Sequence, residues 1–171
     1  MLAATVFAVA AVVVAAFAWA HWPTGRVRDG AKVDLVVVRK SARVLELYSG
    51  SQLLKGFSVS LGGNPVGPKR AEGDQRTPEG AYVLDYRKRD SSFHRALHIS
   101  YPSPADTQHA RVNGVGPGGS IMVHGLPNGL GFIGKLHRLL DWTDGCVALT
   151  NSEIDEIWNA VADGTPIRIE P

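Results

Sequence analysis

Residues 120–149, SIMVHGLPNGLGFIGKLHRLLDWTDGCVAL, hold two short apolar runs, and each run lies next to a reactive side chain. The first run, Ile121 to Val123, ends in His124 and a glycine. A Thr-Asp-Gly turn then leads to Cys146, the only cysteine of the chain, which begins the second apolar run. Short apolar runs bounded by turn residues predict strands. The stretch therefore predicts a cysteine and a histidine at the ends of two strands that the fold brings together.

The cysteine and the histidine suit nucleophilic catalysis. A thiol attacks a carbonyl carbon only as the thiolate, so it needs a base or a positive neighbour. Histidine is the usual partner because its pKa lies near neutrality. Gly145 allows a tight turn that brings backbone N–H groups near the sulfur, where they can stabilise an oxyanion. The alternative is a buried, inert cysteine with a hydrogen-bonded core histidine, and these residues alone leave it open.

The first 20 residues are apolar except for Thr5, so a helix formed by them is hydrophobic on every face. Two interpretations of residues 1–21 stay open. One is a cleaved signal peptide, because residues 16–18 and 18–20 fit the small-x-small cleavage pattern. The other is retained association with the inner membrane. Basic residues follow the run and none precedes it, which opposes export under the positive-inside rule; the chemistry at Cys146 favours export.

Residues 22–31 are predicted to form a polar linker, and residues 32–171 one domain large enough for a core of its own. The net charge is +2 with both signs interspersed, which gives no support to nucleic-acid binding. A single cysteine forbids an intrachain disulfide. In an exported protein, that unpaired thiol is a candidate reactive group.

Apolar and β-branched runs predict that the domain is mainly β (β-rich α+β). The predicted strands cover residues 33–38, 42–48, 53–61, 81–86, 96–100 and 165–169. Long loops are expected over 62–80 and 101–119, where Gly and Pro are frequent. One helix is predicted after Thr150, because residues 150–153 match a capping box and an apolar face follows at Ile154, Ile157, Trp158 and Val161. A second short helix is expected within 132–140.

The motifs resemble those of one known family. His124-Gly125, 18 intervening residues after His124, and the run TDGCV at 143–147 resemble the signature of the L,D-transpeptidase catalytic domain (YkuD-like) family. GDQRTPEGAY at 73–82 resembles a second motif of this family, and the PGG run at 117–119 also fits. The resemblance covers roughly residues 33–169. It implies a mixed-sheet β-sandwich of the L,D-transpeptidase type with one or two short helices.

The resemblance also implies an activity: a cell-wall acyltransferase that acts on peptidoglycan stem peptides and affects cell-wall organisation and shape. Cys146 is expected to form a thioester with a tetrapeptide stem and release D-alanine, with His124 as the general base. Transfer to an amine of a second stem then gives a 3→3 cross-link without a metal or other cofactor. The Gly125 carbonyl is expected to orient the imidazole, Thr143 to support the turn, and the N–H groups of Gly145 and Cys146 to bind the oxyanion.

Two positions depart from the family pattern. Asp144 stands where many members have histidine; it is expected to face outward or to pair with a base, since an inward carboxylate raises the pKa of Cys146. Ala148 stands where many members have an arginine or asparagine that can bind a substrate carboxylate. The candidates for substrate binding are instead Arg138, Arg111, Tyr101 and His98.

Other roles are considered for the remaining histidines. His94 and His98 are four residues apart, a spacing that binds zinc on a helix. The segment is predicted as a strand, where such residues lie ~13 Å apart, so no metal site is expected. His137 lies either near the cysteine or on a loop, and Trp142 is expected to pack rather than to stack on substrate.

Four functions stay in competition. They are the cross-linking transpeptidase, a peptidoglycan amidase or carboxypeptidase with water as the acceptor, an inactive wall-binding module, and a zinc enzyme. The first is preferred. It implies a monomer in the periplasm or elsewhere in the cell envelope, secreted or held there by the N-terminal apolar segment.

Overall fold

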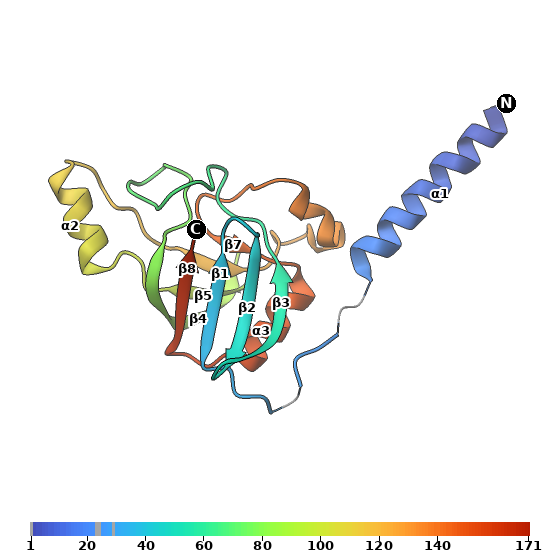
Figure 1. The fold of residues 1–171 in the computed structure, drawn as a ribbon. Helices are drawn as coiled ribbons and strands as arrows, with labels where there is room; N and C mark the ends of the chain where they lie inside the picture. The colour runs from blue at the N-terminus through green and yellow to red at the C-terminus, as the bar shows by residue number, and fades with distance from the viewer. Residues whose placement is uncertain (1, 23–24, 29) are drawn as a thin grey trace.

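The computed structural model describes residues 2–22, 25–28 and 30–171 (Figure 1). The N-terminal segment forms helix α1 (Leu2–His21), which projects away from the rest of the protein. In these described ranges, no helix combines the length and the apolar character needed to cross a membrane.

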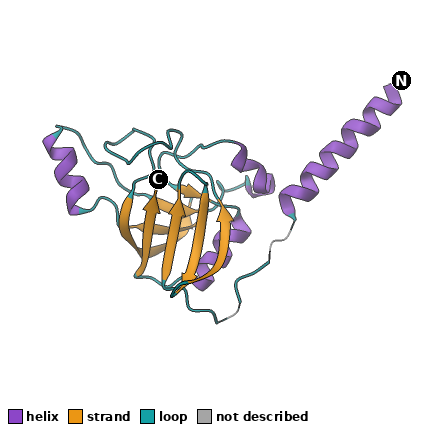
Figure 2. Ribbon diagram, in the orientation of Figure 1, coloured by secondary structure: helices purple, strands orange, loops and turns teal. Residues whose placement is uncertain are grey.

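Eight strands form one continuous mixed sheet that curls around the core (Figure 2). Along the sheet the strands follow the order β3-β2-β1-β8-β4-β5-β6-β7. The pairs β1–β8 and β6–β7 are parallel, and the other neighbours are antiparallel. The strands are β1 (Leu35–Arg39), β2 (Val44–Ser49), β3 (Gln52–Ser58), β4 (Gly80–Ser91), β5 (His94–Ile99), β6 (Met122–His124), β7 (Val147–Ala148) and β8 (Thr165–Glu170).

The two ends of this sheet meet. After β3, the chain continues to Ser60, whose backbone pairs with that of Ala148 in β7 through two hydrogen bonds of 3.0 and 2.8 Å. Gly62 forms a second bridge to Thr143. The edge strand β7 is therefore closed against the segment that follows the opposite edge strand.

Helix α3 (Asn151–Ala160) begins at the predicted capping box, which the structure confirms. The Glu153 carboxylate accepts hydrogen bonds from the backbone N–H of Thr150 at 3.1 Å and from its hydroxyl at 2.7 Å. The apolar face of α3 packs into the sheet: Ile154, Ile157 and Trp158 belong to one buried cluster with side chains from β1, β2, β4, β5, β6, β7 and β8. This core fixes the faces of β6 and β7 that point away from the candidate site.

The prediction of a structureless loop over 101–119 is wrong in part, because helix α2 (Pro104–Val112) lies within it. Ser103 caps this helix, and Asp106 completes a capping box with Pro104 in the first turn. These are helix-start signals, but Ala110 is the only buried residue of the helix. A helix that buries a single residue needs no apolar face, so a search for apolar periodicity does not predict it.

Two further elements differ from the prediction in length or in helix type. Strand β4 continues to Ser91, beyond the predicted end at residue 86, because it pairs with β5 as an antiparallel hairpin. The predicted second short helix corresponds to η1 (Gly131–Leu139), which consists of two 3-10 segments joined by a kink at Gly134. The hairpin of β1 and β2 is confirmed, with paired residues from Leu35↔Tyr48 to Arg39↔Val44.

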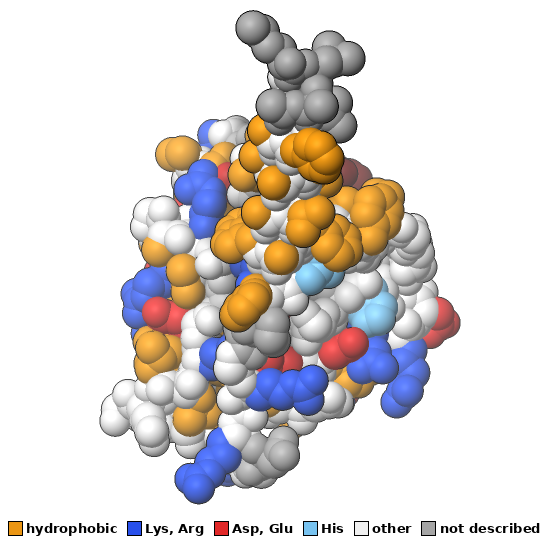
Figure 3. All heavy atoms as spheres, turned by 90° about the vertical axis from the view of Figure 1, so that its right-hand side faces the viewer, with side chains coloured by type: hydrophobic (Ala, Val, Ile, Leu, Met, Phe, Trp, Pro, Cys, Tyr) orange, Lys and Arg blue, Asp and Glu red, His pale blue; other side chains and the backbone are white. Residues whose placement is uncertain are grey.

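The last turn of α1 packs on η1. Ala20 is buried there, and Lys135 Nζ donates to the carbonyl of Trp22 at 2.8 Å. Figure 3 shows apolar side chains along α1 and more of them on the adjacent body. The exposed apolar residues of η1 are Phe132, Leu136 and Leu139.

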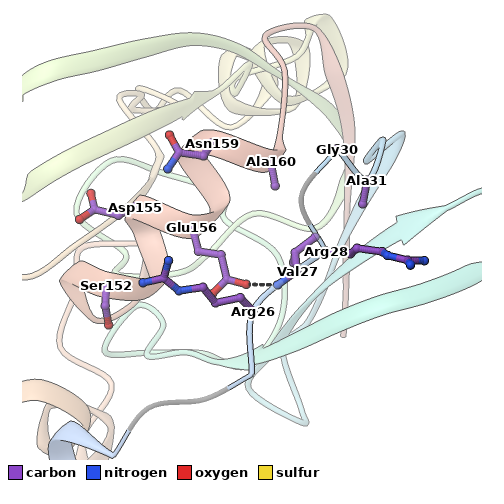
Figure 4. Close-up of a pocket in the computed structure, with 10 residues that line it drawn as sticks. All are labelled: Arg26, Val27, Arg28, Gly30, Ala31, Ser152, Asp155, Glu156, Asn159 and Ala160. Atoms are coloured by element: carbon purple, nitrogen blue, oxygen red, sulfur yellow. Dashed lines mark hydrogen bonds between the residues drawn. The ribbon is translucent and has the colours of Figure 1, made fainter.

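The predicted linker lies along α3 (Figure 4). The backbone N–H of Val27 donates to Glu156 Oε1 at 2.5 Å, and Lys55 Nζ contacts the same carboxylate at 2.7 Å. Residues of the linker and of α3 together line a pocket of about 280 Å³. Val27 also packs against the core, so this segment is attached to the domain.

Candidate active site

Strands β6 and β7 bring the predicted histidine and cysteine to one face of the sheet. In their parallel register, Val123 pairs with Val147 and His124 pairs with Ala148. Both valines are fully buried in the core. Because side chains alternate along a strand, His124 and Cys146 point away from that core. Both line one cavity of about 410 Å³.

The His124 imidazole is buried, with 3% of the residue exposed. Its Nδ1 lies 2.7 Å from the carbonyl oxygen of Gly125. A carbonyl only accepts, so Nδ1 carries the proton and Nε2 has a free lone pair. Burial lowers the pKa of His124, and the hydrogen bond to Gly125 partly opposes this effect. The imidazole is therefore neutral near pH 7, in the tautomer that a general base requires.

Aromatic rings hold the imidazole in place. The Phe93 ring centroid lies 4.5 Å from that of His124, and the Trp142 ring approaches edge-on at 5.8 Å. The Trp142 indole N–H donates to His137 Nδ1 at 3.4 Å, and the Ser60 hydroxyl lies 3.2 Å from the same nitrogen. Burial lowers the pKa of His137 to about 4, so it stays neutral as an acceptor.

The Cys146 thiol is partly exposed to the cavity. The Met122 N–H donates to Sγ at 3.4 Å. Burial raises the pKa of Cys146; the Met122 N–H opposes this effect, and the charge of Asp144 adds to it. With the imidazole also neutral, the resting site holds a thiol and not a thiolate. Attack by this thiol would therefore require a base that removes its proton in the same step.

The turn before the cysteine is held by Thr143. Its Oγ1 accepts from the Gly145 N–H at 3.2 Å and donates to the Cys146 carbonyl at 2.8 Å. Gly145 has φ +125°, and a Cβ there would lie 2.5 Å from the Arg76 carbonyl oxygen. Only glycine fits this position.

The expected oxyanion donors are not both free. The Gly145 N–H already donates to the Thr143 hydroxyl at 3.2 Å within the turn. The Cys146 N–H has no hydrogen-bond partner among the residues that the structure describes. The Cys146 N–H is therefore the backbone donor in this turn that is free to bind an oxyanion.

The loop between β3 and β4 supports the cysteine turn from outside. Gly62 donates its N–H to Thr77 Oγ1 at 3.1 Å, and Thr143 donates its N–H to the Leu61 carbonyl at 3.1 Å. Within the loop, Lys69 and Asp74 form a buried ion pair of 2.8 Å. Burial disfavours the charged carboxylate, but hydrogen bonds from Arg70, Lys69 and other loop groups outweigh it and lower the pKa of Asp74 to about 2.

The candidate substrate-binding residues lie elsewhere. Arg138 pairs with Glu153, and the Tyr101 hydroxyl donates to the Pro117 carbonyl at 2.8 Å. His98 Nδ1 lies 2.7 Å from Asp85, and Arg111 is exposed on α2. In the described part of the chain, none of these four lines the cavity of Cys146.

The two positions that depart from the family pattern have different environments. Ala148 is fully buried against Ser60, so its side chain does not reach a substrate. Asp144 is exposed and lines the cavity. Its charge lies near the thiol, where it raises the pKa of Cys146 as expected of a neighbouring carboxylate.

Sequence reasoning missed part of the cavity wall. Lys88, Phe93 and Ala96 line the cavity beside Trp142. Lys88 lies on the part of β4 that extends past the predicted strand end. The run RKRD at 87–90 is charged throughout and shows no alternation, so the face on which Lys88 lies follows only from the pairing with β5.

The two histidines considered for zinc have separate partners. His94 Nε2 lies 2.9 Å from Asp155, and His98 pairs with Asp85 on β4. Across residues 2–22, 25–28 and 30–171, no cluster of three or more His, Cys, Asp or Glu side chains is arranged to hold a metal ion.

Comparison with known proteins gives consistent matches. The model of the L,D-transpeptidase catalytic domain (YkuD) matches residues 33–169. YafK of Escherichia coli (strain K12), whose name assigns it to the L,D-transpeptidases, is 30% identical over 132 residues, covering 74% of this chain and 46% of YafK. The chain thus spans about half the length of the curated relatives it matches.

Solved structures share the fold. A variant of the helical cell shape determining protein Pgp2 from Campylobacter jejuni is 26% identical, with a TM-score of 0.63 over 82% of this chain and 48% of that one. The L,D-transpeptidase from Mycobacterium smegmatis is 17% identical, with a TM-score of 0.52 over 83% of this chain and 60% of that one. The predicted mixed-sheet, mainly β fold of this type is confirmed.

Proposed function

Because the chain belongs to the L,D-transpeptidase catalytic domain family, we propose that it is a cysteine-dependent acyltransferase acting on peptidoglycan stem peptides. One observation carries the proposal: His124 and Cys146 line the same cavity, with Nδ1 of the histidine bound to the Gly125 carbonyl. This arrangement leaves Nε2 to accept the thiol proton. The substrate class and the roles of the two residues come from the family, and the geometry of the two residues supports these roles.

The first half-reaction forms a thioester. His124 Nε2 takes the thiol proton while Sγ attacks the carbonyl carbon that precedes the terminal D-alanine. The tetrahedral oxyanion accepts a hydrogen bond from the Cys146 N–H. When the intermediate collapses, the C–N bond breaks and the imidazolium gives its proton to the departing amine. D-alanine leaves, and the stem stays bound to sulfur.

The second half-reaction transfers the stem. An amine of another stem attacks the thioester, His124 accepts the amine proton, and the C–S bond breaks. The released sulfur regains its proton from the imidazolium. The product is a 3→3 cross-link, and water in place of the amine gives a shortened monomeric stem.

A substrate in peptidoglycan requires that the domain act where peptidoglycan lies. We propose that residues 1–21 direct the domain to the cell envelope, outside the inner membrane. The segment of residues 25–28 and 30–31 attached to α3 then joins the export segment to the catalytic domain.

Incubation of the full chain with purified tetrapeptide muropeptides tests the activity. Released D-alanine together with 3→3 dimers is the expected result, and shortened monomers alone assign hydrolysis instead. Cys146→Ala is expected to abolish both products, and a carbapenem is expected to form a covalent adduct on Cys146. Full activity of Cys146→Ala would falsify the mechanism.

A further inference from the structure

The cavity of Cys146 has one positive side chain on β4 and one negative side chain just before β7, and the strands β5 and β6 lie between these two strands. Among the described residues that line it, Lys88 is the only lysine or arginine and Asp144 the only acid. The other lining side chains are neutral near pH 7 or apolar. A substrate that carries a carboxylate therefore meets attraction at Lys88 and repulsion at Asp144.

Strand pairing places Lys88 in line with the general base. Lys88 pairs with Ala96, Ala96 pairs with His124, and His124 pairs with Ala148. Directly paired residues project from the same face of a sheet. Two strand spacings separate Lys88 from His124, roughly 10 Å between backbones. The small side chain of Ala96 lies between them, so the lysine stem can extend across it toward the reacting bond.

The Lys88 ammonium is available for a ligand. It has no hydrogen-bond or ion-pair partner in the described part of the chain, and it is exposed. Three other cations of this region are already in ion pairs: Arg87 with Asp163, Arg95 with Asp155, and Lys69 with Asp74.

The position two residues after the cysteine cannot perform this task, because Ala148 is buried against Ser60. We propose that Lys88 binds a carboxylate of the stem peptide and, opposite Asp144, sets the direction in which the peptide enters the cavity. This proposal rests on the acyl-transfer function above. Two groups could supply the carboxylate: the terminal D-alanine, and the side chain of the stem's diamino acid.

Steady-state kinetics of Lys88→Met and Lys88→Arg test the proposal. Methionine keeps the unbranched stem without the charge. We expect its KM for the tetrapeptide to rise about tenfold or more with little change in kcat, since an ion-paired hydrogen bond is lost on binding. Lys88→Arg restores most of the affinity. Lys32→Met, which removes the same charge from an exposed position outside the cavity, leaves KM unchanged.

Two modified substrates identify the carboxylate. One carries a terminal D-alanine amide, and the other carries an amidated diamino acid side chain. The KM of Lys88→Met should differ from the wild-type KM on the unmodified peptide. The two KM values should become equal on the substrate that lacks the carboxylate bound by Lys88. If the two proteins have equal KM for the tetrapeptide, or differ equally on all three substrates, the proposal is overturned.

The experiments distinguish a failure of the proposed acyl-transfer function from a failure of the proposed role of Lys88. A wild-type protein that makes no product and no Cys146 adduct contradicts that function. A wild-type protein that turns over the tetrapeptide while Lys88→Met matches it contradicts the role of Lys88 alone. Iodoacetamide alkylation of Cys146 uses no carboxylate-binding residue, so it should proceed at the same rate in both proteins.

Discussion

Replacing Thr143 by valine should loosen the cysteine turn and destabilise the protein. The buried hydroxyl accepts from the Gly145 N–H at 3.2 Å and donates to the Cys146 carbonyl at 2.8 Å. Valine has nearly the same shape but satisfies neither group. Each buried polar group left without a partner costs about 1–3 kcal/mol. The expected loss is roughly 2–6 kcal/mol for the two groups, or about 4–24 °C in Tm for a chain of this size.

Thermal and urea unfolding followed by circular dichroism measure this loss. Thr143→Ser keeps the hydroxyl and should retain most of the stability. Thr107→Val is the matched control, because its hydroxyl also donates to a backbone carbonyl, at 3.0 Å, but lies exposed on α2. A surface change of this kind costs about 0.5 kcal/mol or less. If Thr143→Val unfolds at the same temperature as Thr107→Val, the two hydrogen bonds do not hold the turn.

Three further predictions concern the same region. Alkylation of Cys146 by iodoacetamide should rise about tenfold per pH unit between pH 6 and 8, because burial raises its pKa; a plateau below pH 7 would contradict a resting thiol. Asp74→Asn should be less stable than wild type at pH 7, and urea titrations should show the difference shrinking below pH 4 and vanishing near pH 2, since the folded-state pKa of Asp74 is lowered to about 2. Gly145→Ala should abolish the carbapenem adduct through its clash with the Arg76 carbonyl, whereas Gly164→Ala, at φ +88° in open space, should keep it; mass spectrometry separates the two outcomes.

Local signals predicted much of the fold. The capping box at Thr150 and the apolar spacing after it located α3, because both features are set by neighbouring residues. The same kind of signal at Ser103 marks α2, but the many Pro and Gly residues around it favoured a loop. Prediction thus failed where a real helix start lay in a segment with almost no apolar face.

The candidate pair of Cys146 and His124 was predictable, and its surroundings were not. Cys146 and His124 carry motifs that can be read along the chain. Lys88 reaches the site through the pairing of β4, β5 and β6, and pairing register depends on contacts between distant segments. The engagement of the Gly145 N–H by Thr143 likewise depends on the rotamer of one side chain.

The pairing of Ser60 with Ala148 has a consequence for how the protein folds. These two backbones come from distant parts of the sequence, so their pairing closes a long loop of the chain. Closing a long loop costs more conformational entropy than forming a local hairpin, so such a contact tends to form late. The strands near the N-terminus can pair early as local hairpins, whereas the cysteine turn gains its support only as the sheet closes. The environment of the Cys146 thiol is therefore expected to be completed only at the end of folding, when the sheet closes around the turn.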